Sequence, residues 1–245
     1  MIRYEGFTKR YGRTTAVAGL DLEVREGETL ALVGPNGSGK TTTLKAAVGL
    51  IRPTAGCVTV DGHDASTRAA RERLGYLPQR LAFPESATAR EIVAFYARLR
   101  GADPREVDRN LERVGLAADA SREVQGFSGG MLQRLGIAVA LLGRPRALLL
   151  DEPSAALDPT GALDVREIVA EIAREGTTVM LSSHDLAEVA ALADRVAFFA
   201  DGELRAVGEP GELVDALGVA AAIPPGTSDL EVLYRAFTAP ARRVA

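Results

Sequence analysis

The sequence predicts one α/β domain with a mainly parallel core sheet, an N-terminal antiparallel β part and an inserted helical lobe. Short apolar runs alternate with helix-like segments near both ends of the chain, as they do around a parallel sheet. A glycine-rich loop over residues 34–41 joins one such run to a helix-like segment. Helical periodicity over residues 88–142 separates the first strands from the last, which indicates helices inserted into the core.

The first part of the chain predicts β structure. Arg3–Lys9 and Ala16–Val24 alternate loosely between apolar and polar residues, as strands do. Thr29–Val33 is a continuous apolar run typical of a buried parallel strand, and Thr41–Val48 can form the helix that follows it.

Two further strands are expected before the helical region. Cys57–Val60 ends at the turn pair Asp61-Gly62, and Gly75–Leu77 leads to Pro78-Gln79. Cys57 is the single cysteine, so the chain can form no internal disulfide, and we expect a buried thiol.

The central region predicts helices with clear start signals. Thr88–Glu91 is a capping-box pattern, and the apolar residues that follow it share one helical face: Ile92, Phe95, Tyr96 and Leu99. Asp103-Pro104 begins a second helix that ends at Gly115 and carries apolar residues at helical spacing: Val107, Leu111 and Val114.

The core resumes after residue 145. The expected elements are a strand at 147–150, a helix at 164–175 stopped by Gly176, a strand at 177–181, a hairpin at 196–207 turning at Asp201-Gly202, and a short helix at 209–217. A last apolar cluster lies at 230–237. We therefore divide the single domain, 1–245, into an α/β core (1–86 and 145–217), a helical lobe (87–144) and a C-terminal extension (218–245).

Composition narrows the class of protein. The chain is 47% hydrophobic and 25% charged, which is typical of a globular domain. Its net charge of −4 lacks the basic footprint of a nucleic-acid-binding domain, so we expect no nucleic-acid partner. No stretch approaches the ~20 apolar residues of a membrane span, and no apolar signal region opens the chain, so a cytoplasmic location is expected.

Residues 34–41 carry the strongest motif. Gly-Pro-Asn-Gly-Ser-Gly-Lys-Thr follows an apolar strand and opens a helix, the context in which backbone N–H groups cradle a triphosphate. Lys40 supplies a compact positive charge and Thr41 a Mg²⁺ ligand. Only three lysines occur in the chain, which makes a chance match rare. The loop predicts nucleotide binding.

Two carboxylates follow the apolar strand at 147–150. Asp151 is placed to bind Mg²⁺, directly or through water, and Glu152 to polarise the water that attacks the γ-phosphate. Ligands bind beyond the carboxyl ends of strands in open α/β sheets, so this pair is expected near the loop.

The order of the motifs resembles the nucleotide-binding subunit of an ATP-binding cassette (ABC) transporter, a P-loop NTPase. The resemblance rests on the two motifs above and on Tyr11, Gln79, His184 and the signature loop Phe127-Ser128-Gly129-Gly130-Met131. It implies that Tyr11 stacks on adenine, that Gln79 binds Mg²⁺ and couples it to a membrane partner, and that His184 is the switch histidine. Each of these residues alone has an ordinary structural explanation, such as a surface amide for Gln79 or a helix cap for His184.

The family resemblance also implies a shared site. ATP would be held by Gly34, Pro35, Asn36, Gly37, Ser38, Gly39, Lys40, Thr41 and Thr42 of one copy and closed over by the signature loop of a second, with Asp158 in cross-subunit contact. Glu152, His184, Lys40 and Gln79 would act in catalysis, and Thr41, Gln79 and Asp151 would hold Mg²⁺. The resemblance also implies that opening and closing of the dimer drives a separate transmembrane permease. This chain would then lie peripherally on the cytoplasmic face of the inner or plasma membrane.

The sequence departs from the family pattern at three places. Phe127 and Met131 replace the usual Leu and Gln of the signature loop, and Ala156 stands where glycine is common. The Ser-Gly-Gly centre remains, so we expect ATPase activity to be retained.

Several segments are similar to ATPases of bacterial ABC-2-type exporters: 74–79, 95–101 and 230–234. Within that group they are similar to the ATPase that serves copper-site maturation of nitrous oxide reductase. The alternatives are an importer ATPase, a non-transport ABC ATPase acting on nucleic acid or ribosomes, and a soluble P-loop kinase or GTPase. The last would not need the signature loop or His184.

Overall fold

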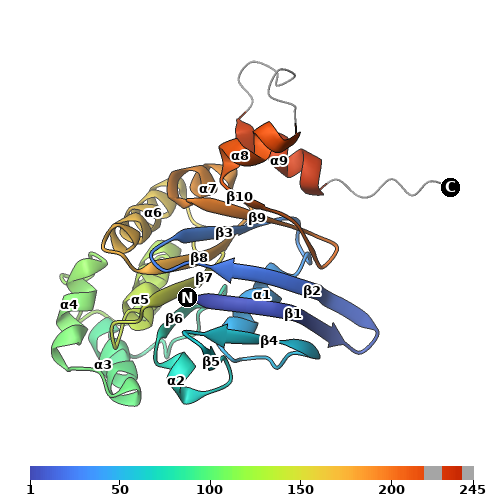
Figure 1. Cartoon of the computed structure of the whole chain (residues 1–245). Coiled ribbons are helices and arrows are strands. Elements are labelled where there is room, and N and C mark those ends of the chain that lie inside the picture. The colour runs from blue at the N-terminus through green and yellow to red at the C-terminus, as the bar shows by residue number, and fades with distance from the viewer. Residues whose placement is uncertain (218–227, 239–245) are drawn as a thin grey trace.

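The computed structural model describes residues 1–217 and 228–238, which form two sheets with helices between and around them (Figure 1). One sheet is antiparallel and four-stranded, in the order β2-β1-β4-β5. Its strands are β1 (Ile2–Tyr11), β2 (Thr14–Val24), β4 (Ala55–Val60) and β5 (His63–Asp64). The predicted N-terminal β part is confirmed.

The second sheet is six-stranded, in the order β10-β9-β3-β8-β7-β6, and only β10 runs antiparallel to its neighbour. Its strands are β3 (Thr29–Val33), β6 (Leu74–Leu77), β7 (Ala147–Asp151), β8 (Thr178–Ser183), β9 (Arg195–Ala200) and β10 (Glu203–Gly208). The carboxyl ends of β3, β7 and β8 meet at one edge, where the loops that follow them lie together.

Helix α1 (Lys40–Ala47) lies between the two sheets. It contacts β2 and β4 of the antiparallel sheet as well as β7 and β8 of the parallel one. Leu44 and Ala47 on this helix are buried in a core that both sheets share. The helix that opens at the phosphate loop is therefore fixed on two sides.

Other helices cover the opposite face of the six-stranded sheet. Those between β6 and β7 are α3 (Ala89–Arg100), α4 (Arg105–Arg113), the short η1 (Val124–Gly126) and α5 (Gly129–Ala140). The others on this face are α6 (Pro159–Arg174), α7 (Leu186–Leu192), α8 (Pro210–Leu217) and α9 (Asp229–Thr238). The short α2 (Arg68–Arg71) lies apart from them, against β5 and β6, with Ala70 in the core that contains α1. The capping box predicted at Thr88 and Glu91 is present.

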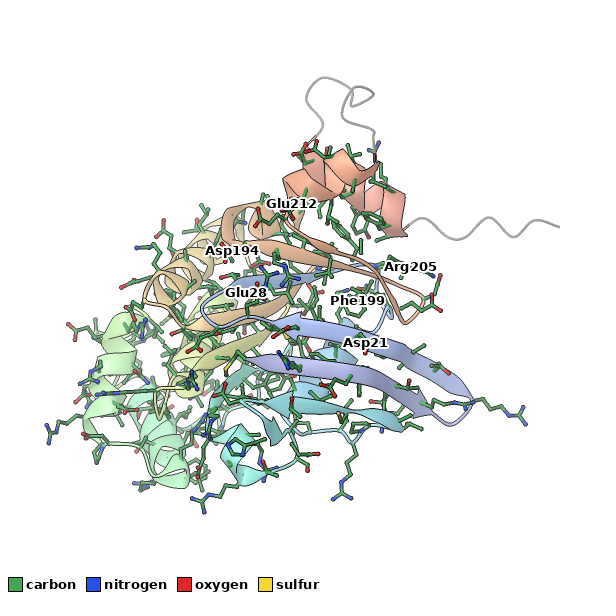
Figure 2. All side chains as sticks on the ribbon, viewed as in Figure 1. Asp21, Glu28, Asp194, Phe199, Arg205 and Glu212 are labelled. Carbon is green, nitrogen blue, oxygen red and sulfur yellow. The ribbon has the colours of Figure 1, made fainter. Side chains whose placement is uncertain are left out.

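Polar contacts anchor the start of β3. The Thr29 N–H donates to Asp194 Oδ2 at 2.8 Å, and Glu28 pairs with Arg195 at 3.1 Å. Glu28 and Asp194 are labelled near this end of β3 and β9 in Figure 2. These contacts set the position of the strand that leads into the phosphate loop.

The structure corrects two expectations and one alternative explanation. Helix α6 begins at Pro159 rather than at 164, because Asp158 caps it by accepting the Gly161 N–H and a proline is favourable in the first turn. Cys57 is partly exposed rather than buried, with its Sγ 3.6 Å from Glu5 Oε2. Asp185, not His184, caps α7. Much of the predicted C-terminal extension, 218–227 and 239–245, lies outside the described residues.

Candidate active site

The phosphate loop runs from the end of β3 to the start of α1, as predicted. Gly34 and Gly39 have φ of 157° and 108°, and a Cβ on Gly34 would come within 2.1 Å of the Phe199 carbonyl oxygen. Phe199 is labelled on β9 in Figure 2. The close approach of β9 requires glycine at position 34.

Helix α1 presents its N-terminus to the loop. No side chain caps it and no acidic residue lies in its first turn. Helix N-termini bind anions because their first N–H groups are unpaired and the helix dipole is positive there. The geometry suits a polyphosphate.

Lys40 reaches back over the loop. Its Nζ donates to the carbonyl oxygens of Gly34, at 2.7 Å, and Pro35, at 3.2 Å. Burial lowers the pKa of Lys40, and the nearby carboxylates of Glu152 and Asp151 act in the opposite direction. The side chain is thus a buried cation held at the mouth of the loop.

Asp151 ends β7 and faces the first turn of α1. Its Oδ1 accepts hydrogen bonds from Thr41 Oγ1 at 2.9 Å and from Ser182 Oγ at 2.8 Å. Its Oδ2 is buried and has no partner among the described residues. Ser182 belongs to no sequence motif, and its pairing with Asp151 across β7 and β8 becomes evident only in the folded chain.

These atoms fit a magnesium ion. Hydroxyl and carboxylate oxygens are the ligands that Mg²⁺ prefers, and the ion usually joins one or two carboxylates to substrate phosphates. Thr41 Oγ1, the unpaired Asp151 Oδ2 and the Gln79 amide are the candidate groups. Gln79 lines the same cavity as Thr41.

Glu152 lies between two basic groups. Its Oε1 is 3.9 Å from Lys40 Nζ, and its Oε2 is 2.5 Å from His184 Nδ1. The residue has φ of 55°, a left-handed conformation that costs a non-glycine residue about 1–2 kcal/mol. Its N–H donates to Ser182 Oγ at 3.0 Å, which helps to hold this conformation. Strain of this kind often marks functional residues.

A cavity of about 380 Å³ opens over the loop. It brings together Ala16, Asn36, Gly37, Ser38, Gly39, Lys40, Thr41, Thr42, Gln79 and Glu152. Tyr11 does not line it: the residue ends β1, is largely exposed and has Lys9 Nζ 5.1 Å from its ring centre. The cavity therefore brings Gln79 and Glu152 to residues 36–42 of the phosphate loop, although these three segments lie far apart in the sequence.

The signature loop lies elsewhere. Ser128 caps α5, its Oγ accepting the Met131 N–H at 3.3 Å, and its hydroxyl donates no hydrogen bond to the residues that the structure describes. Phe127 has the Arg122 guanidinium 5.6 Å from its ring centre. Gly129 approaches Leu157 and Gly130 approaches Gly161, close to Asp158. None of the five residues from Phe127 to Met131 lines the phosphate cavity.

A phosphate loop at one parallel strand end, opposed by Asp151 at the end of β7 and by Glu152 directly after it, is the arrangement of a P-loop NTPase. The sequence pattern described as ABC transporter matches residues 17–155. The chain belongs to the ABC transporter family, and within it to the ATP-binding proteins that act as ATPases. Among the described residues, no helix combines the length and apolar character needed to cross a bilayer.

Several bacterial proteins similar to this chain are named as ATP-binding proteins of transport or resistance systems. The chain is 41% identical to an uncharacterised ABC transporter ATP-binding protein, YxlF of Bacillus subtilis, over 87% of this chain and 72% of that protein. It is 35% identical to the linearmycin resistance ATP-binding protein LnrL of the same organism, over 89% and 72%. It is also 35% identical to the lantibiotic transport ATP-binding protein SrtF of Streptococcus pyogenes, over 83% and 89%. The resemblance to exporter ATPases is confirmed.

Solved structures agree with the fold. An ATP-binding subunit of an ABC transporter superposes with a TM-score of 0.84 at 27% identity, over 97% of this chain and 99% of the other. A dimeric bacterial cassette, MJ0796, gives 0.77 at 28% identity, over 85% and 98%. The same cassette is known in a post-hydrolysis state bound to ADP and phosphate.

Proposed function

We propose that two copies of this ATPase close over Mg-ATP and that hydrolysis drives export by a separate transmembrane permease. One observation carries the catalytic part: Glu152 is held at the phosphate cavity between Lys40 and His184, at 3.9 Å and 2.5 Å. A carboxylate so placed can accept a proton from an attacking water, and an adjacent imidazole can orient it.

The cavity residues divide the work of binding. The backbone of residues 34–39 and the N-terminus of α1 would hold the β- and γ-phosphates, with Thr42 beside them. Lys40 would exchange its bonds to the Gly34 and Pro35 carbonyls for phosphate oxygens, and Tyr11 would stack on the adenine. Bound Mg²⁺ would neutralise phosphate charge, and Thr41, Asp151 and Gln79 would hold it.

A second copy would complete the site. The signature loop of one copy does not line its own cavity, yet the Ser128 hydroxyl donates no hydrogen bond to the described residues and α5 begins there with no acidic residue in its first turn. Both features suit the γ-phosphate of a partner copy. Asp158, on the neighbouring loop, would lie at the same interface. The dimeric cassette MJ0796 supports this arrangement.

The permease is proposed to dock beside Gln79. Near the start of the helical lobe, α3 leaves Phe95 and Leu99 50% and 67% exposed, and Leu50 is 63% exposed. Monomeric proteins rarely gather such side chains without a partner. Leu50 and the Tyr96 ring line one cavity, and Tyr96 and Phe95 line the next. This chain would then sit on the cytoplasmic face of the membrane, and the names of the resistance and lantibiotic relatives favour export.

Light scattering of Glu152→Gln tests the shared site. With Mg-ATP the variant should shift from monomer to dimer, because it can bind but not hydrolyse; with Mg-ADP it should stay monomeric. No shift, despite demonstrated ATP binding, would remove the basis for a cross-subunit role of Ser128, Gly129 and Gly130.

The permease interface has its own test. Leu99→Glu should abolish copurification with the membrane subunit, whereas Arg105→Glu, at an exposed position on α4, should not. Equal recovery of the complex with both variants would rule out docking at α3. If the purified complex hydrolysed ATP equally fast with and without the Lys40→Ala substitution, the proposed site would be ruled out.

A further inference from the structure

Glu188 is a buried carboxyl outside the phosphate cavity. It lies on α7, is 1% exposed, and is absent from the residues that line the cavity. Its Oε2 accepts a hydrogen bond from Ser183 Oγ at 2.6 Å, and its Oε1 has no hydrogen-bond partner among residues 1–217 and 228–238. Buried carboxyl groups are expensive to retain, so this one calls for an explanation.

The Ser183 hydroxyl links Glu188 to the turn that carries His184. Ser183 Oγ donates to Glu188 and accepts the Asp185 N–H at 3.0 Å. Ser183 and Asp185 flank His184 on either side. The carboxyl therefore fixes the Ser183 hydroxyl, which in turn holds Asp185 at the other end of this three-residue turn.

The same carboxyl faces the loop after Glu152. The Ser154 hydroxyl lies close enough to lower the pKa of Glu188, although it makes no hydrogen bond of standard geometry. The charged groups nearby are Asp185 and Arg166, which pair with each other at 3.5 Å. Glu188 thus bonds the segment of His184 through Ser183, and Ser154 in the loop after Glu152 lowers its pKa; the side chains of these two segments meet in the contact between His184 Nδ1 and Glu152 Oε2.

We propose that Glu188 is a positioning residue for ATP hydrolysis: by bonding Ser183 it holds the His184 turn so that the imidazole stays against Glu152. The inference rests on the roles proposed above for Glu152 and His184. Glu188 itself does not reach the phosphate cavity, so its loss should affect turnover more than nucleotide binding.

Three variants separate positioning from general stability. Glu188→Met keeps the length of the side chain but accepts no hydrogen bond from Ser183, whereas Glu188→Gln keeps an acceptor oxygen. Glu167→Met, at an exposed glutamate on α6, is the matched control. The readouts are kcat and KM for Mg-ATP, and the NMR signals of the His184 imidazole. The chain has two histidines, so a His63→Gln variant assigns them.

Glu188→Met should lower kcat about tenfold with KM changed less than about twofold, because a misplaced catalytic group costs rate rather than binding. It should also shift the His184 signals and leave those of His63 in place. Glu188→Gln and Glu167→Met should resemble the unmodified protein in all three readouts.

Unchanged kcat and unchanged His184 signals in Glu188→Met would overturn the proposal and leave the proposed function standing. If Glu188→Gln lowered kcat as much as Glu188→Met, the proposal would also be overturned, because the acceptor oxygen would then not account for the effect. If the unmodified protein failed to hydrolyse ATP, the proposed function would fall, and the His184 signals would still decide whether Glu188 holds the turn.

Discussion

Thr41 Oγ1 donates a hydrogen bond to Asp151 Oδ1 at 2.9 Å, joining two residues that are 110 positions apart. Thr41 lies in the first turn of α1, and Asp151 ends β7. The bond fixes the first turn of the phosphate-loop helix to the strand that ends at Asp151, directly before Glu152. It leaves Asp151 Oδ2 as the free oxygen that would face a metal ion.

Removal of this bond should weaken the fold and Mg-ATP binding together. Thr41→Val keeps the shape of the side chain and deletes the hydroxyl, so it should lower the free energy of unfolding by about 1–2 kcal/mol, since hydrogen bonds to charged groups are worth more than average. Thr41→Ser should behave as the unmodified protein. Urea unfolding measures the first effect and nucleotide titration the second; equal stability of the Val and Ser variants would contradict the assignment.

Alanine substitutions at Gly34 and at Gly37 should lower the free energy of unfolding by different amounts. Both have positive φ, which costs an alanine about 1–2 kcal/mol. At Gly34 the new Cβ would also lie 2.1 Å from the Phe199 carbonyl oxygen, whereas at Gly37 nothing lies within 4 Å. Gly34→Ala should therefore lose about 1–3 kcal/mol more than Gly37→Ala. Chemical denaturation of the two variants checks the difference, and similar losses would mean that β9 can move away.

Ala156 is strained and should tolerate glycine well. Its φ is 61°, a conformation that glycine adopts freely. Ala156→Gly should raise the free energy of unfolding by up to about 1 kcal/mol, since relief of strain is partly offset by the greater freedom of the unfolded chain. Ala155, whose φ is not positive, provides the control: Ala155→Gly should destabilise. Thermal unfolding distinguishes the two, and destabilisation by both would show that Ala156 is not strained.

The free energy of unfolding should depend on pH through the ionisation of Glu188. Burial raises its pKa above the ordinary value of 4.5, and hydrogen bonds from Ser183 and Ser154 partly oppose this. The favourable contribution of the protonated carboxyl is present below the unfolded pKa and lost as pH rises through the folded one. Asp185 adds to the shift and Arg166 reduces it.

Glu188→Gln cannot ionise, so it should gain stability relative to the unmodified protein as pH rises from about 5 to about 8. Unfolding free energies at the two pH values give the difference directly. A constant difference would mean that Glu188 ionises equally in the folded and unfolded states. Glu167→Gln, exposed on α6, should show no such dependence.

Local sequence was sufficient for much of the architecture. The run Thr29–Val33, the capping box at Thr88 and the loop at 34–41 each contain the physical cause of their structure within a few residues: apolar burial, side-chain capping and glycine. Their predictions held because neighbours along the chain supply those causes. The predicted start of α6 at residue 164 is wrong because Asp158 caps the helix by accepting the Gly161 N–H, so that it begins at Pro159.

Exposure was harder to predict than periodicity. Ile92, Phe95 and Leu99 share the expected helical spacing on α3, yet only Ile92 of the three is buried. Periodicity states which residues share a face; it does not state how wide a surface the rest of the protein offers to cover that face. The same holds for Cys57, whose strand was predicted and whose exposure was not.

The sequence by itself determined that the chain binds a nucleotide, because the glycines, Lys40 and Thr41 act through a contiguous loop between a strand and a helix. Only the tertiary structure decided that Asp151 is shared between Thr41 and Ser182, that Glu152 lies between Lys40 and His184, and that Glu188 is buried beneath the turn of His184. Those relationships join segments that meet only when parallel strands align their carboxyl ends, so no local pattern encodes the distances between them.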